Sequence, residues 1–179
     1  MGQQARHLGR SNLPAELTSF VGRRQELREV KRLLGTTRLL TLTGSGGCGK
    51  TRLALRAAAD MSRGFPHGGW LVSLAPVQDP MLVPQAVFAA LGLQDRSAGL
   101  SLSSLMEYLA GKRLLLVLDN CEHLLDGCAM LASTLIRSCP GLHVLATSRQ
   151  ALGAAVRSGW PCRRSRCPRS AMTSRSSRY

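Results

Sequence analysis

The stretch that decides the fold is "LLTLTGSGGCGKTRLAL", residues 39–55. Its first five residues are apolar or β-branched and predict a short buried strand, and the glycines that follow predict a loop. From Lys50 to about Met61 the chain is rich in alanine and leucine, which predicts a helix. The loop, Gly44 to Thr51, fits the pattern G-x-x-x-x-G-K-[ST]. The stretch therefore predicts a strand, a glycine-rich loop and a helix in direct succession.

The glycine-rich loop has the composition of a phosphate-binding site. Glycines allow backbone dihedrals that aim several N–H donors inward, and a phosphate chain needs such donors. Lys50 would place its charge on the β- and γ-phosphates, and the hydroxyl of Thr51 would bind Mg²⁺. The helix that starts at Lys50 adds its positive end. Because the strand and the helix are correctly placed, we interpret the loop as a nucleotide-phosphate site rather than an incidental glycine-rich turn.

Apolar strands and helices alternate along the rest of the chain. Strands are predicted within residues 38–44, 69–76, 113–119 and 142–148, and helices before Gly35, within 81–93 and 102–111, and around 124–135. The run from Leu114 to Leu118 is apolar at every position, which is typical of a strand buried on both faces. This order predicts an α/β fold, a parallel sheet with helices on both faces.

Two further polar residues follow predicted strands. Asp119 ends "LLLVLD", and an acid there would hold Mg²⁺ or, as the alternative, cap the next helix. Arg149 ends "LATSR", and it would reach the γ-phosphate or, considered alone, be a solvated loop arginine. Ligands of open α/β sheets gather at the carboxyl ends of strands, so the phosphate loop favours the binding roles.

Composition limits the other classes of function. The formal net charge is +14, but residues 151–179 hold seven arginines and no acid, so the body of the chain is only mildly basic. No apolar run is long enough to span a bilayer and the start lacks a secretory signal, so we expect a cytoplasmic protein with no membrane partner. The six cysteines show neither paired nor zinc-ligand spacing, so no disulfide framework or zinc site is predicted.

Together these segments resemble a known family. "LPAELTSFVGRRQEL", "LLTLTGSGGCGKTRLAL", "LLLVLDNCEHLLDGC" and "CPGLHVLATSRQALG" are similar to the P-loop ATPase module of the signal-transduction ATPases related to NB-ARC (STAND class), and most similar to the bacterial LuxR-type and antibiotic-regulator ATPases. The resemblance covers about residues 13–153. It implies a P-loop NTPase fold of the ASCE type that binds ATP or ADP with Mg²⁺ and acts as a switch in transcriptional control, with self-association in the full-length form.

The resemblance also implies roles for individual residues. Those expected near the nucleotide are Val21, Gly22, Arg23, Gly44, Ser45, Gly46, Gly47, Cys48, Gly49, Lys50, Thr51 and Arg52. Thr51 and Asp119 would hold Mg²⁺, and Arg149 would act as the sensor of the γ-phosphate. Many ATPases of this broad class have a glutamate after the Mg²⁺ aspartate, but this chain has Asn120, which lacks a titratable carboxylate. Glu122 is the nearest substitute, so we expect slow ATP hydrolysis at most.

The last part of the chain departs from the family. We expect a flexible arm over residues 1–12, the nucleotide-binding domain over 13–153 without its last strand, and a basic tail over 154–179. The tail is either an arginine-rich arm that binds nucleic acid, or out-of-frame sequence; its loss of acids and of apolar periodicity favours the second. Two alternatives to the switch therefore stay open. One is a small basic nucleic-acid-binding protein with a vestigial P-loop, and the other is a truncated, non-functional product.

Overall fold

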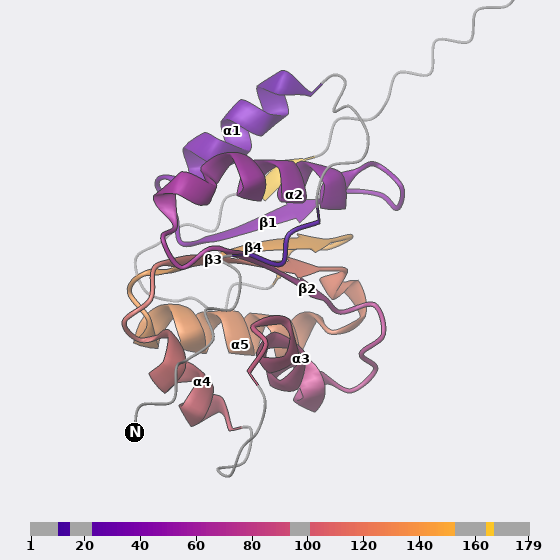
Figure 1. The fold of residues 1–179 in the computed structure, drawn as a ribbon. Coiled ribbons are helices and arrows are strands. Elements are labelled where there is room, and N and C mark those ends of the chain that lie inside the picture. The colour runs from indigo at the N-terminus through magenta and orange to yellow at the C-terminus, as the bar shows by residue number, and fades with distance from the viewer. Residues whose placement is uncertain (1–10, 15–22, 94–100, 153–163, 167–179) are drawn as a thin grey trace, which may run out of the picture.

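Five parallel strands form one sheet at the centre of the molecule (Figure 1). The computed structural model describes residues 11–14, 23–93, 101–152 and 164–166. The strands are β1 (Leu39–Thr43), β2 (Gly69–Ser73), β3 (Leu114–Asp119), β4 (Leu142–Ser148) and β5 (Arg164–Arg166). Their order in the sheet is β2-β3-β4-β1-β5. The predicted α/β class and the parallel sheet are therefore confirmed.

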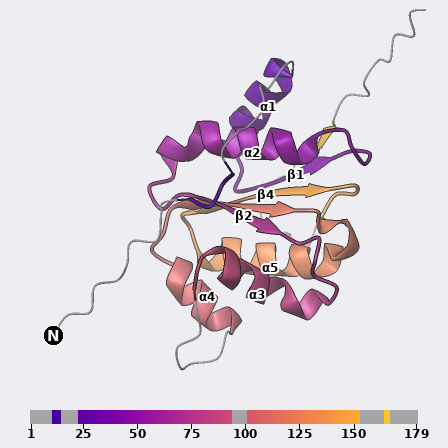
Figure 2. The same cartoon turned by 45° about the vertical axis from the view of Figure 1, so that its right-hand side comes forward.

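Helices cover both faces of this sheet, as Figures 1 and 2 show from two directions. Helices α1 (Arg24–Leu34) and α2 (Lys50–Met61) lie on one face, and α3 (Val83–Ala90), α4 (Leu102–Leu109) and α5 (Leu125–Ser138) lie on the other. Three short 3₁₀ turns complete the elements: η1 (Ser62–Gly64), η2 (Pro80–Leu82) and η3 (Cys121–His123). Within the described residues, no helix has the length and apolar character needed to span a membrane.

The sheet divides the interior into two apolar cores. Side chains of a strand alternate between its faces, so Leu114, Leu116 and Leu118 pack with α3, α4 and α5. The intervening Leu115 and Val117 pack with α1 and α2. Both sets are fully buried, which explains why this strand is apolar at every position.

The carboxyl ends of the parallel strands lie together on one side of the molecule. In the register of the sheet, Thr43 of β1 lies beside Ser148 of β4, and Ser73 of β2 lies beside Asp119 of β3. β4 is inserted between the strand that precedes the P-loop and the strand that ends in Asp119. The loops that follow β1, β3 and β4 therefore converge on one region, where the predicted polar residues meet.

A short N-terminal segment lies against the outer edge of β2. Ser11 forms a parallel bridge with Gly69, and the side-chain amide of Asn12 accepts a hydrogen bond from Leu71 N (2.6 Å) and donates one to Leu71 O (2.9 Å). Asn12 thus satisfies backbone groups that an edge strand would leave exposed. The sequence placed both residues in the arm of residues 1–12, whereas the structure places them on the sheet; residues 1–10 lie outside the described part.

A short fifth strand from the predicted basic tail lies at the edge of the sheet next to β1. Residues Arg164–Arg166 pair in parallel with β1, opposite Thr41, Leu42 and Thr43. They occupy the position next to β1, the strand that precedes the P-loop. Strand pairing uses backbone N–H and C=O groups, so the open edge of β1 accepts a polar segment that apolar patterning cannot reveal. The other residues of the predicted tail lie outside the described part of the chain.

Candidate functional site

The P-loop joins β1 to α2 and has the backbone that its glycines allow. Gly47 and Gly49 have φ angles of 72° and 82°, in the left-handed region where other residues are strained. A Cβ added at Gly47 would meet no atom within 4 Å. Glycine is therefore required at position 47 because of its backbone angle, and not because a side chain would lack space.

Lys50 begins α2 and turns its side chain back over the loop. Its Nζ donates hydrogen bonds to the carbonyl oxygens of Gly44 and Ser45, both at 2.9 Å. No carboxylate pairs with this ammonium group among the described residues. Its positive charge therefore stays at the loop, where an anionic ligand would meet it.

Asp119 lies at the end of β3, beside the first turn of α2. Its Oδ1 accepts a hydrogen bond from Thr51 Oγ1 at 2.7 Å and another from Thr147 Oγ1 at 2.6 Å. Thr147 in turn accepts a hydrogen bond from the backbone N–H of Asn120 at 3.0 Å. The predicted pair of oxygen ligands, Thr51 and Asp119, is thus brought together by the fold.

Thr147 was not among the predicted site residues, although it belongs to the same "LATSR" segment as Arg149. Its hydroxyl is buried and orients both the carboxylate and the chain that follows it. A threonine that directly follows the apolar residues 144–146, two residues before the predicted sensor, was the available signal.

Arg149 and Glu122 form an ion pair near the loop. Arg149 Nε lies 3.1 Å from Glu122 Oε1, and a Cβ added at Gly46 would lie 3.7 Å from Arg149 Nη2. The guanidinium group is largely exposed and therefore accessible to a ligand. The predicted sensor is close to the P-loop, and the predicted substitute base is already paired with it.

The segment between β3 and α5 holds these groups in place. Asn120 has a left-handed backbone, with φ of 67°, and this turns the chain sharply after Asp119. His123 Nε2 lies 2.7 Å from the carbonyl oxygen of Val77 in the loop after β2, so this histidine links two loops. The hydrogen bond with Cys128 and burial raise the pKa of the Cys121 thiol, which favours its neutral form.

The remaining predicted contacts are only partly described. Arg23 lies beside the loop, because a Cβ added at Gly49 would be 3.3 Å from its Nη1. Cys48 donates its backbone N–H to Ser45 O at 3.4 Å, and Arg52 lies exposed on α2. Val21 and Gly22 fall outside the described residues.

Comparison with known proteins gives the family. Residues 23–157 match the NB-ARC domain. An uncharacterized protein of Mycobacterium tuberculosis is 46% identical over 144 residues, which cover 80% of this chain and 37% of that protein. A second M. tuberculosis protein, named as an HTH-type transcriptional regulator, is 42% identical over 131 residues (73% of this chain, 15% of that protein). Regulatory protein AfsR of Streptomyces griseus is 31% identical over 152 residues (78% and 15%).

Solved structures agree on the fold. A Pyrococcus horikoshii STAND protein (Signal Transduction ATPase with Numerous Domains) with a tetratricopeptide repeat sensor matches with a TM-score of 0.58 and 15% identity, over 87% of this chain and 24% of that one. Cdc6p from Pyrobaculum aerophilum matches with a TM-score of 0.53 and 20% identity, over 77% and 41%. The chain thus has a P-loop NTPase fold, and it spans at most 37% of the length of the three relatives described above. The P-loop, Asp119 and Arg149 lie together at the carboxyl ends of the strands, and the family match covers most of the chain. The protein therefore belongs to the NB-ARC domain family.

Proposed function

We propose that this chain binds ATP and ADP together with Mg²⁺ and serves as the switch module of a signal-transduction ATPase. The observation that carries the proposal is the convergence of three groups at one edge of the sheet. The P-loop carries an ammonium group that has no carboxylate partner among the described residues, the Thr51 hydroxyl lies 2.7 Å from the Asp119 carboxylate, and Arg149 lies beside Gly46. A triphosphate with a divalent cation requires these three kinds of group together.

The phosphates would be held by backbone N–H groups of the loop and by Lys50, whose ammonium group exchanges its carbonyl partners for phosphate oxygens. The positive end of α2, which starts at this lysine, favours the same anion. Thr51 and Asp119 suit Mg²⁺, because hydroxyl and carboxylate oxygens are the hard ligands that it prefers, and the fold already places them within one hydrogen bond. Mg²⁺ neutralises phosphate charge when it is bound.

Hydrolysis is proposed to be slow because neither residue 120 nor residue 122 offers an unpaired carboxylate to activate water. The residue after Asp119 is Asn120, whose carboxamide does not titrate in the physiological range. Glu122 is held by Arg149 in an ion pair of 3.1 Å. A site of this kind suits a switch, which must keep its triphosphate long enough to signal.

The proposed setting is transcriptional regulation within a longer protein. Two of the relatives carry names of transcriptional or regulatory proteins, and each matches over only 15% of its length. We infer that DNA contacts and self-association belong to parts of such proteins beyond the matched region.

The first test is nucleotide binding by calorimetry with the variant Lys50→Ala. Loss of charge-assisted hydrogen bonds to phosphate, each worth about 1.5–3 kcal/mol, should weaken ADP and ATP binding by about 10- to 100-fold or more. The control is Lys112→Ala, which removes an ammonium group that lies 3.9 Å over the ring of Tyr108, where it takes no part in the proposed site. Unchanged ADP affinity in Lys50→Ala, with a normal melting curve, would refute the proposal.

The second test separates the sensor from its partner. Glu122→Gln weakens the ion pair and leaves Arg149 available to the γ-phosphate, so ATP affinity should rise while ADP affinity stays constant. An exposed pair is worth about 0.2–1 kcal/mol, which limits the gain to roughly fivefold. Glu107→Gln on α4 removes an exposed carboxylate from the other layer and serves as the control. Equal changes for ATP and ADP would show that Arg149 does not read the γ-phosphate.

A further inference from the structure

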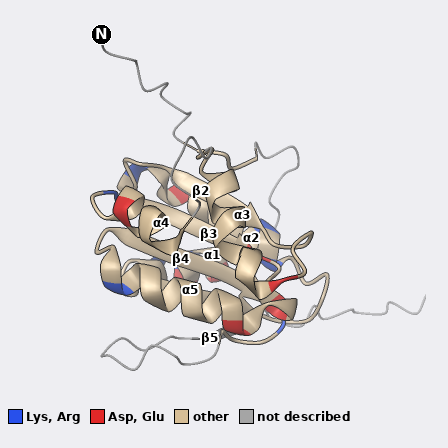
Figure 3. Cartoon of the chain, turned by 90° about the horizontal axis from the view of Figure 1, so that it is seen from below, with Lys and Arg blue, Asp and Glu red and all other residues tan. Residues whose placement is uncertain are grey.

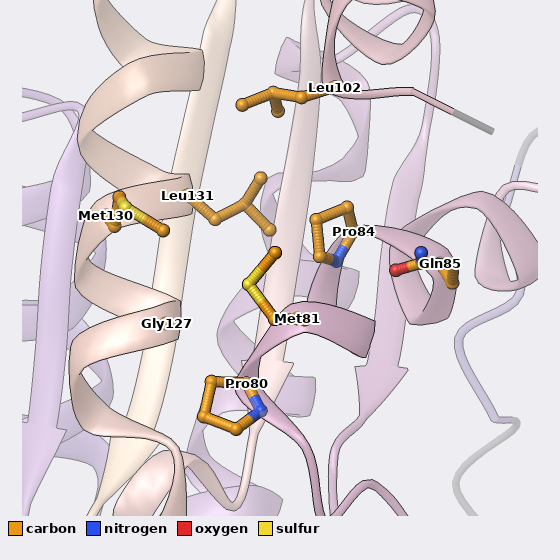
Figure 4. A pocket seen from close by; sticks show the side chains of 8 residues that line it. All are labelled: Pro80, Met81, Pro84, Gln85, Leu102, Gly127, Met130 and Leu131. Carbon is orange, nitrogen blue, oxygen red and sulfur yellow. The ribbon is translucent and has the colours of Figure 1, made fainter.

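A cavity of about 250 Å³ lies on the face of the molecule formed by α3, α4 and α5, in the layer opposite α1 and α2. Figure 4 shows Met81 reaching from η2 into the space between α5 and α3. The lining is almost entirely apolar: Pro80, Met81, Pro84, Gln85, Leu102, Gly127, Met130 and Leu131. None of the proposed nucleotide contacts takes part in it.

Large exposed apolar side chains lie close together at the mouth of this cavity. In the described part of the chain, the large hydrophobic residues that remain exposed are Met81 (71%), Leu82 (48%) and Met130 (61%). Two of them line the cavity, and Leu82 belongs to the same 3₁₀ turn as Met81. Clustered exposed apolar residues mark binding surfaces, and methionine adapts its shape to a partner. The cluster therefore indicates a surface that something covers.

One polar group in the lining lacks a hydrogen-bond partner among the described residues. Gln85 Oε1 is buried and has no hydrogen-bond partner within the described residues. Figure 4 shows its carboxamide beside Pro84 at the cavity. A buried acceptor without a donor is unfavourable, so it points to an N–H or O–H group supplied by a bound molecule.

The charges at the mouth are acidic in a chain that is strongly basic. The chain has 24 lysines and arginines against 10 acids, and yet Asp79 and Asp126 are exposed next to the lining residues Pro80 and Gly127. Packing of Pro80 on Gly127, where an added Cβ would lie 2.9 Å from the proline Cβ, brings the two acids to one end of the cavity. Neither forms an ion pair among the described residues.

Among the described residues, α3, α4 and α5 carry only two charged residues besides Asp126, namely Glu107 and Arg137, and most of their ribbon is tan in Figure 3. The surface thus combines an apolar cavity, one unsatisfied acceptor and a negative end. Its walls are helices and 3₁₀ turns that expose no strand edge, which excludes strand addition and favours a helix lying in the groove.

We propose that this cavity is the docking site of a basic amphipathic helix from a partner protein. The helix inserts one large apolar side chain between Met81 and Met130. An N–H donor of the helix pairs with Gln85, and lysines or arginines on its flank face Asp79 and Asp126. This surface is separate from the proposed nucleotide site and does not depend on it.

The test uses a fluorescein-labelled helical peptide with leucines on one face and lysines on the other, and its binding to the whole chain is followed by anisotropy. Saturable binding is expected, and Met130→Ser and Asp126→Asn should each weaken it by about tenfold. Both residues are exposed, so the fold should persist, and an unchanged melting curve checks this. Glu26→Gln on α1, in the opposite layer, is the charge control and should have no effect.

Matched peptides decide between possible occupants. A peptide with glutamates for lysines, or with serines for leucines, should bind at least about tenfold more weakly, because it lacks one of the two features. Equal binding of these peptides, or binding that neither variant weakens, would overturn the proposal. A dimer of the chain itself that Met130→Ser abolishes would also overturn it, because a second copy would then be the occupant. A third possible occupant is the chain's own segment 94–100. If the peptide binds only after this segment has been replaced by a Gly/Ser linker, the segment itself occupies the cavity and the proposal is refuted.

Discussion

Replacement of Thr147 by valine should destabilise the domain by about 3 kcal/mol, although the side chain keeps its volume. The hydroxyl of Thr147 donates to Asp119 Oδ1 at 2.6 Å and accepts from the N–H of Asn120 at 3.0 Å. Thr51 still bonds to the carboxylate, so loss of the first contact should cost roughly 1.5 kcal/mol, at the lower end for a charged acceptor. The partly buried N–H of Asn120 loses its acceptor, which adds roughly 1.5 kcal/mol.

Urea unfolding followed by circular dichroism measures this loss. With a slope of about 2 kcal/mol per molar, the midpoint should fall by about 1.5 M. The matched control is Thr41→Val in β1: Thr41 is equally buried, but its Oγ1 has no hydrogen-bond partner among the described residues. Removing an unsatisfied hydroxyl should stabilise the domain by about 1 kcal/mol. Equal losses in both variants would refute the reasoning, because the effect would then belong to any threonine-to-valine change in the sheet.

Two further predictions concern stability. Burial lowers the pKa of His143, whose ring lies edge-on to Phe65 at 5.1 Å, so the unfolded chain binds a proton more readily below about pH 6.5 and stability falls as the pH drops. His143→Gln should remove up to about 1.4 kcal/mol per pH unit of this slope in urea unfolding between pH 7.5 and 5.5, and an unchanged slope would contradict it. In Gly141→Ala, the new Cβ would lie 2.5 Å from the backbone oxygen of Lys112, which should lower stability by about 2 kcal/mol. Gly111→Ala, with open space around its Cβ, should stay within about 0.5 kcal/mol of the parent by thermal melting, and similar losses in both would exclude the clash.

The elements that the sequence predicts well are those whose signals are local. The helix predicted from Lys50 to about Met61 is α2, because alanine and leucine run between a glycine loop and a glycine-proline segment. The predicted strand 113–119 contains β3, because a continuous apolar run admits few other structures. The positions of the P-loop, Asp119 and Arg149 at one edge followed from the rule for parallel strands.

The contacts that the sequence could not predict are those between distant segments. Glu122 and Arg149 are 27 residues apart, and nothing in either segment shows that they form a pair. Asn12 meets Leu71 through a side-chain amide, which leaves no periodic pattern. Segment β5 pairs with β1 as a parallel strand, but its sequence of two arginines and a serine carries no strand signal.

The segment from the last residue of β3 to the end of η3, residues 119–123, has a consequence for how such sequences can vary. Each of its five residues makes a different contact. In chain order, the partners are Thr51 on α2, Thr147 at the end of β4, Leu118 in β3, Arg149 after β4 and Val77 in the loop after β2. A substitution removes one of these contacts, whereas an insertion or deletion of one residue displaces every contact that follows it relative to β3. The length of this segment should therefore be constrained as tightly as its composition, and natural differences in chain length should accumulate elsewhere.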